Sequence, residues 1–338
     1  MTRKAALDPG PWMNLYEAAR AFNGLQPWRL LGDDQVFGVM DPKSGRMGYC
    51  CVLGALDELF ALSVYRGAIG YDCYKKTRDA DSDADIDDAM SIADILMAEF
   101  VDWEEVHKED KAAMRRAGAG FSGPNMFPVF RSTKPGRIPW HIDDAEAFYL
   151  SAALKRGSAV FAAVSTGALD LASQPGRILC FYPGETTGRW EDEPALPRRE
   201  SVPIQVDSAA AMSIRSYPIR AELVWEADAA GTTSVVKGKP GPYFAQAALV
   251  VDRASLFLFP VELYEPGAPA AQKAADAVCR ACADARVRPA RIVVRSQELL
   301  VALEPLGTAL GVSLERGAVP SLDRVRADMA AAMRRRSR

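Results

Sequence analysis

Residues 37–74 constrain the fold more than any other stretch, because they alternate apolar strands with tight turns. Residues 41–45 (DPKSG) indicate a turn, since proline fixes φ and glycine accepts a positive φ. In the strand that follows, alternation puts Tyr49 and Cys51 on one face and Cys50 and Val52 on the other. Strands over 35–40, 47–53 and 59–65 are therefore predicted to form an antiparallel meander that helices can cover on both faces.

A helix is predicted ahead of this meander. Pro11 suits its start and Gly24 suits its end, and its apolar residues recur at helical spacing. These apolar residues are Trp12, Leu15, Tyr16, Ala19 and Phe22. We expect the first core to be the meander covered by this helix, with Phe60 among the core residues.

Four further segments follow the meander. Residues 79–88 form an acidic loop, and the apolar residues of 92–116 predict a second helix. Residues 118–139 are rich in glycine and proline, which predicts irregular structure. Asp143, followed three residues later by Glu146, resembles a capping box and opens a helix that runs to Arg156.

A chain of 338 residues is long enough for two domains. We predict an α+β protein with an N-terminal domain over 1–160, an irregular β-containing connection over 161–210 and a C-terminal domain over 211–338. Short strands are expected in the connection at 177–182 and 202–206. The last domain is predicted as a three-layer-like α/β unit of order βββαβαβα. Its strands cover 220–227, 243–251, 256–264, 291–295 and 312–315, and its helices cover 269–286, 297–310 and the segment from Ser321.

Composition narrows the classes of protein. The net charge of −3 gives no strong field toward nucleic acid or membranes, so nucleic acid is not supported as a partner by charge. No apolar run reaches the about 18 residues of a membrane span, and the first residues show no secretory signal. Six cysteines in so long a chain do not look like a disulfide framework, so we expect a cytoplasmic protein.

Two stretches carry a family resemblance. The first is the meander with its YCCVLG wording, together with Trp12, Pro27-Trp28 and the later FRSTKPGRIPW. The second is residues 289–326, with PARIVVRSQEL followed by LEPL and LG. Both stretches resemble domains of unknown function in bacterial proteins, sometimes joined in one chain. The resemblance assigns no catalytic residues and no cofactor.

The order of elements from residue 220 onward also resembles ribonuclease H-like folds. That resemblance implies two Mg²⁺ ions held by carboxylates on the first and fourth strands. Here the fourth strand ends in Arg295-Ser296, and Asp228, Asp252 and Glu298 have no spacing that forms a cluster. The resemblance makes a metal-dependent nuclease the alternative function, and the missing carboxylate cluster makes a degenerate one the other form of that alternative.

Candidate contact residues lie in the loop after residue 130. Arg131, Arg137, Trp140 and His141 are predicted to line an anion or aromatic pocket; the competing interpretation is a loop pinned by a buried Trp140. At the end of the chain, Arg334, Arg335 and Arg336 (with Arg338 beyond them) are predicted either to complement a helix dipole or to contact an acidic partner or nucleic acid.

No metal site is predicted. The acidic loop from Asp79 has Ala84 and Met90 where a calcium loop needs glycine and glutamate. Cys279 and Cys282 form a single CxxC without a second ligand pair, so we expect no zinc. The sequence thus predicts a non-catalytic binding or interaction protein of unknown partner or ligand, with no cofactor. A small-molecule enzyme that uses the loop at 131–141 is a third hypothesis.

Overall fold

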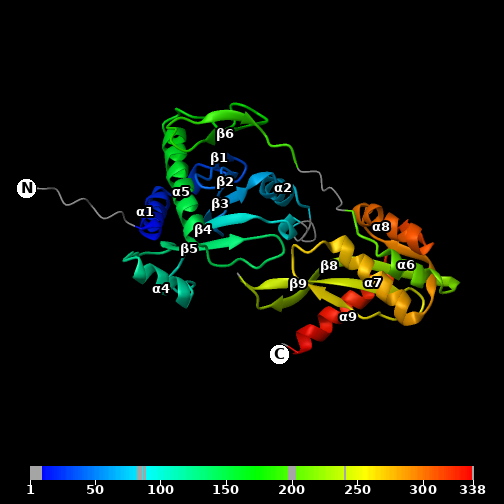
Figure 1. Cartoon of the computed structure of the whole chain (residues 1–338). Coiled ribbons are helices and arrows are strands. Elements are labelled where there is room, and N and C mark those ends of the chain that lie inside the picture. Colours follow the sequence, from blue (N-terminus) through cyan, green and yellow to red (C-terminus); the bar gives the residue numbers. More distant parts are fainter. Residues whose placement is uncertain (1–9, 82–85, 87–88, 197–202, 240, 337–338) are drawn as a thin grey trace, which may run out of the picture. The chain divides into compact units, whose positions relative to one another are not determined.

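The computed structural model describes residues 10–81, 86, 89–196, 203–239 and 241–336. The chain divides into two compact units, residues 1–197 and 198–338. Figure 1 shows a mixed sheet with helices in each unit. The α+β fold class is therefore confirmed, and each unit is described by itself below.

The first unit is built on a seven-stranded sheet of order β5-β4-β3-β2-β1-β6-β7. Neighbouring strands from β1 to β5 pair antiparallel, β6 runs parallel to β1, and β7 pairs antiparallel with β6. The strands are β1 Phe37–Met40, β2 Met47–Leu53, β3 Phe60–Arg66, β4 Ile95–Val101, β5 Phe127–Thr133, β6 Arg177–Phe181 and β7 Arg189–Asp192.

The predicted meander is confirmed, with helices on both of its faces. Cys50 and Val52 of β2 belong to one core, which contains residues of α1 (Pro11–Leu25) and α5 (Asp144–Ser165). Tyr49 and Cys51 belong to the core on the other face, beneath α2 (Gly67–Arg78). The short 3₁₀ turn η1 (Pro27–Arg29) follows α1. Figure 1 shows α1 and α5 side by side, in agreement with their extensive contacts.

The capping box at the start of α5 is also confirmed. The Asp143 carboxylate accepts a hydrogen bond from the Glu146 backbone N–H at 2.8 Å. The Glu146 carboxylate accepts one in return from the Asp143 backbone N–H at 3.1 Å. These bonds satisfy two N–H groups that the helix cannot bond internally. The helix continues to Ser165, nine residues past the predicted Arg156.

The predicted helix over 92–116 is wrong in its first half. Residues 95–101 form β4, and only Lys108–Arg116 is helical, as α4. The apolar residues of β4 lie on both faces of a central strand, so they also match helical spacing and the pattern does not discriminate. The expected irregular segment 118–139 is wrong as well, because it contains β5, a strand that flanking glycines and prolines hide.

Helix α2 and strand β7 of the first unit lack a sequence prediction. Helix α2 contains Gly67 and Gly70, which weaken helical propensity. Gly67 itself has φ +66° and adjoins the Arg46 guanidinium, which explains a glycine there. Strand β6 confirms the strand predicted at 177–182. Together with β7 it extends the first sheet beyond β1, although both strands lie within 161–210, where a connection is expected.

The second unit contains a five-stranded sheet of order β10-β9-β8-β11-β12. Helices α6, α7 and α8 cover one face, and α9 covers the other. The elements are α6 Ser208–Arg215, β8 Ile219–Val236, β9 Tyr243–Asp252, β10 Glu262–Tyr264, α7 Ala270–Ala285, β11 Arg288–Val294, α8 Gln297–Leu310, β12 Ser313–Arg316 and α9 Pro320–Arg336. This is the predicted three-layer order βββαβαβα, preceded by α6.

Two strand predictions in this part need correction. The strand expected over 256–264 is reduced to β10, because residues 252–257 form a turn in which Leu256 has φ +60°. Of the strand expected at 202–206, residue 202 lies outside the described residues and 203–206 are not a strand. No helix in the described part of the chain has the length and apolar character needed to cross a membrane.

Candidate ligand pocket

The structure joins two of the four predicted loop residues through one carboxylate. Arg131, at the end of β5, donates two hydrogen bonds to Asp110 of α4, at 2.8 and 2.6 Å. His141 approaches the same carboxylate, with 3.8 Å between its Nδ1 and Asp110 Oδ1. Asp110 is buried, whereas the His141 side chain is 41% exposed. Arg131 thus fixes the Asp110 carboxylate, and His141 lies next to this carboxylate at the surface.

A pocket of about 550 Å³ opens beside this group. It lies between α1, α4, β5 and the loop ahead of α5. Its lining residues are Trp12, Tyr16, Glu109, Asp110, Ala113, Arg116, Ala117, Phe130, His141 and Ile142. The volume falls within the range of small-molecule sites, and such sites combine aromatic walls with a few placed polar groups.

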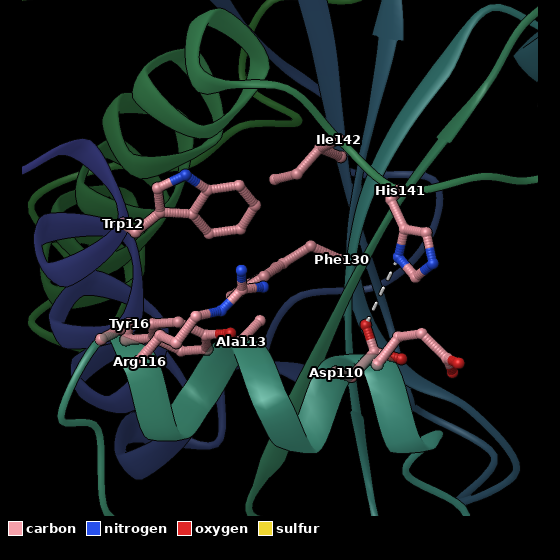
Figure 2. A pocket seen from close by; sticks show the side chains of 10 residues that line it. Trp12, Tyr16, Asp110, Ala113, Arg116, Phe130, His141 and Ile142 are labelled. Atoms are coloured by element: carbon pink, nitrogen blue, oxygen red, sulfur yellow. Dashed lines mark ion pairs between the residues drawn. The ribbon is translucent and has the colours of Figure 1, made fainter. Parts of the chain in front are cut away.

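Arg116 is the polar group that stands out among these residues. Figure 2 shows its guanidinium pointing up from α4 into the space between Trp12 and Phe130. Within the described part of the chain, Arg116 forms no ion pair and no hydrogen bond from its side chain. The pocket therefore holds a cation without a counter-ion beside two aromatic rings.

The indole of Trp12 is held in a fixed orientation. Its Nε1–H donates to the Asp144 carboxylate at the start of α5, at 2.8 Å. No other aromatic ring among the described residues stacks on it. The ring is half-buried against the core and leaves one surface on the pocket.

Tyr16 and Phe130 form the opposite, aromatic part of the wall. Their ring centroids are 5.2 Å apart with the planes tilted by 54°. Burial raises the pKa of the Tyr16 hydroxyl far above its ordinary value; the charge of Asp110 adds to this rise and the charge of Arg116 opposes it. The hydroxyl therefore remains protonated at any physiological pH and can act as a hydrogen-bond donor.

Of the four residues predicted to line a pocket, only His141 lines this one; Arg131, Arg137 and Trp140 do not. Trp140 is 42% exposed, and its ring contacts His141 with 5.0 Å between centroids. Its backbone pairs with Ser132, at 2.8 and 2.9 Å, so the loop is tied down by main-chain hydrogen bonds rather than by a buried indole.

Sequence reasoning did not find Trp12, Tyr16, Asp110 or Arg116 as site residues. Asp110, Ala113 and Ala117 recur at spacings of three and four residues, which places them on one face of a helix. That pattern indicates one face of a helix, but it does not show which segment packs opposite that face. The approach of α1 to α4 is a long-range contact without a local signal.

A second polar centre lies at the end of β3, around Arg66. The buried guanidinium donates to Asp94 at 2.6 Å, to Glu146 at 2.7 Å and to Ser132 at 3.0 Å. Burial would raise the pKa of Glu146, but hydrogen bonds from Ser132 and Arg66 outweigh it, and the pKa is lowered. Because these groups are partners of one another, the cluster fixes the start of α5 to the strand ends.

The buried carboxylates Glu226 and Asp252 of the second unit do not converge. Asp228 lies on the same face of β8 as Glu226 and pairs with Arg326 of α9 at 3.0 Å. Glu226 is fully buried on the face of α9, where it accepts hydrogen bonds from Arg253 at 2.7 Å and from the Leu322 backbone N–H at 2.8 Å. Asp252 pairs in register with Trp225, which faces the opposite core. Across the described residues, no group of three His, Cys, Asp or Glu side chains is placed to hold a metal ion.

The remaining candidates are less accessible or fall outside the described residues. Cys279 and Cys282 are free thiols on α7, and burial raises their pKa values to about 11 and about 12. Arg334, Arg335 and Arg336 end α9, but their side chains are not among those described. Most of the acidic loop at 79–88 also lies outside the described residues.

Two families match the chain. One is described as Domain of unknown function (DUF7309) and matches residues 12–180. The other is described as Domain of unknown function (DUF6930) and matches residues 211–330. No curated protein and no solved structure matches. The expected resemblance of both parts to domains of unknown function is confirmed.

Proposed function

For this chain, which belongs to the family of the domain of unknown function DUF7309, we propose that the first unit is a non-catalytic receptor for a small organic ligand. The family has no described function, so the proposal is drawn from the pocket. The observation that carries this proposal is the pocket of about 550 Å³ with fixed aromatic walls. The ligand takes the place of water against Trp12 and Phe130.

Several features support binding rather than reaction. The described residues that line the pocket include no serine, cysteine or lysine that could act as a nucleophile. His141 lies 3.8 Å from Asp110, beyond hydrogen-bond distance, and the carboxylate is already engaged by Arg131. The groups are therefore arranged to hold the walls in place.

The second candidate is the nuclease at the C-terminal half. The observed element order supports the expected resemblance to ribonuclease H-like folds, but the placement of charges does not favour catalysis. Glu226 and Asp252 face opposite sides of the sheet, and Glu226 is neutralised by Arg253. After the fourth strand, β11, the side chain present is Arg295, paired with Asp323. Two-metal chemistry needs carboxylates that share one site.

Filling the pocket tests the receptor proposal. Ala113 lines the pocket on α4, whereas its neighbour Ala112 does not, so Ala113→Phe and Ala112→Phe form a matched pair. The probes are two fluorescent compounds, the anion anilinonaphthalene sulfonate and the neutral N-phenylnaphthylamine. We expect Ala113→Phe to abolish binding of whichever probe the wild type binds, and Ala112→Phe to retain it.

The result is interpreted only together with a thermal melt of each variant, since a loosened core also binds such dyes. If both variants melt like the wild type and bind equally well, the pocket is not the site and the proposal fails. If the wild type binds neither probe, the proposal fails for this class of compound.

The cytoplasmic location of the protein stays a prediction.

A further inference from the structure

We infer that the pocket selects planar aromatic anions, with Arg116 as the counter-ion for the acidic group. This inference rests on the proposed receptor function and adds the chemical class of its ligand. The anionic group can be a carboxylate, a sulfonate or a phosphate, because all three present oxygens to a guanidinium in the same way.

The first step of the argument is that Arg116 is not used elsewhere. It belongs to the last turn of α4 and is exposed. Two other arginines of the first unit do have partners: Arg131 bonds Asp110, and Arg20 donates to the Gly120 carbonyl at 2.6 Å. Across the described residues, no carboxylate or carbonyl is paired with the Arg116 side chain.

The second step concerns the two carboxylates of the pocket. Glu109 is in the first turn of α4, at the opposite end of the helix from Arg116, and also lines the pocket. Asp110 lines it, but its two oxygens are both bonded by Arg131, at 2.8 and 2.6 Å. A bidentate pair of this kind largely cancels the carboxylate charge at short range. Arg116, which has no such partner among the described residues, is therefore the cation of the pocket that can pair with the acidic group of a ligand.

The third step concerns shape. Figure 2 places Trp12 and Phe130 on two sides of the Arg116 guanidinium. The Trp12 ring cannot rotate freely, because Asp144 holds its Nε1–H. Rigid aromatic surfaces favour a flat ring system, which gains stacking without an entropic cost to the wall. A flat ring against Trp12 thus brings an attached acidic group close to Arg116.

The test compares Arg116→Gln with Arg115→Gln. Both arginines end α4 and both complement its dipole, but only Arg116 lines the pocket. With anilinonaphthalene sulfonate as the anionic probe, Arg116→Gln is expected to weaken binding about tenfold or more, the scale of a lost charge-assisted hydrogen bond. Binding of neutral N-phenylnaphthylamine should not change, and Arg115→Gln should bind both probes like the wild type.

The outcomes separate this inference from the receptor proposal. If Arg116→Gln leaves the anion as tightly bound as before, or weakens both probes equally, selection by Arg116 is refuted while the pocket can still be the site. If Ala113→Phe leaves both probes bound, the receptor proposal fails as well. Arg116→Lys should recover part of the lost affinity, and added salt should weaken only the anionic probe.

Discussion

The two units anchor a helix to a sheet through buried charges of opposite sign. In the first unit the buried group is a cation, Arg66, which holds Asp94 and Glu146 and so fixes the start of α5. In the second unit it is an anion, Glu226, which accepts the Leu322 N–H and so fixes the start of α9. In both units the buried charge is matched by groups that come from distant parts of the chain.

The units differ in how they use their remaining charges. Residues 198–338 contain 20 Lys and Arg against 15 Asp and Glu; the totals of 41 and 44 leave 21 against 29 for residues 1–197. The net charges are therefore +5 and −8. In the basic unit, Arg253, Arg280 and Arg295 are nevertheless paired with acids. The first unit has more acidic than basic residues, so a surplus of arginine does not explain why Arg116 lacks a partner there.

The largest effect is expected from Arg66→Met. It removes the cation and leaves two carboxylates poorly solvated, and breaking a buried pair in this way costs about 3–5 kcal/mol of unfolding free energy. Arg46→Met is the control, because Arg46 bonds the same Asp94 at 2.6 Å from a side chain that is 43% exposed. Urea unfolding of the full chain, followed by a probe of each unit, measures both. Equal losses for the two variants would refute the ranking.

Glu226→Ala should destabilise the second unit by about 2–3 kcal/mol, because it leaves the Leu322 N–H and the Arg253 Nε–H without an acceptor. The loss should be smaller than for Arg66→Met, since the Arg253 side chain is 39% exposed and can bind water. Glu226→Gln, which keeps one acceptor, should lose less. A loss below about 1 kcal/mol for Glu226→Ala would show that α9 is held mainly by its apolar contacts.

Acid should weaken the first unit through Glu146. Its pKa is lower in the folded state than in the unfolded chain, so the stability that it contributes is complete above the unfolded pKa. That contribution is lost as the pH falls from about 4.3 through the lowered folded value. Glu146→Gln should therefore be less stable at neutral pH and show a shallower loss on acidification. Parallel pH profiles of the urea midpoint in both proteins would contradict this.

A smaller effect is expected at the helix cap. Asp143→Ala removes the acceptor of the Glu146 N–H and should cost about 1 kcal/mol. Asp144→Ala is a sharper comparison, because Asp144 instead accepts the Trp12 indole N–H. It should leave the cap intact and loosen the pocket wall. If both variants lose the same stability and bind ligand probes equally, the separate roles of these neighbouring acids are refuted.

Local signals predicted the fold where strands and helices follow their own patterns. The alternation of Tyr49 and Cys51 with Cys50 and Val52 gave the meander its two cores, and helix α8 spans the predicted residues 297–310. Predictions failed where two patterns coincide, as in β4, whose apolar residues fit a helix equally well. Phe60 is half-buried, so its truncation will cost less than the removal of a fully buried phenylalanine.

The site was less predictable, because it depends on contacts between distant segments. His141 and Arg131 were found from their loop, but their common partner Asp110 is 21 residues from Arg131 along the chain. The bond between Trp12 and Asp144 spans 132 residues. No local pattern encodes such pairs, so the chemistry of a pocket assembled from four segments emerges only in the folded chain.

The most direct test of the pocket is to follow the tryptophan indoles by nitrogen–proton correlation NMR during titration with naphthoate. Each of the six tryptophans gives one indole N–H signal, and Trp12→Phe and Trp225→Phe assign the two that matter. We expect the Trp12 signal to shift with saturation while that of Trp225, buried in the second unit, stays in place. A Trp12 signal that does not move at a naphthoate concentration that shifts other residues would contradict binding in this pocket.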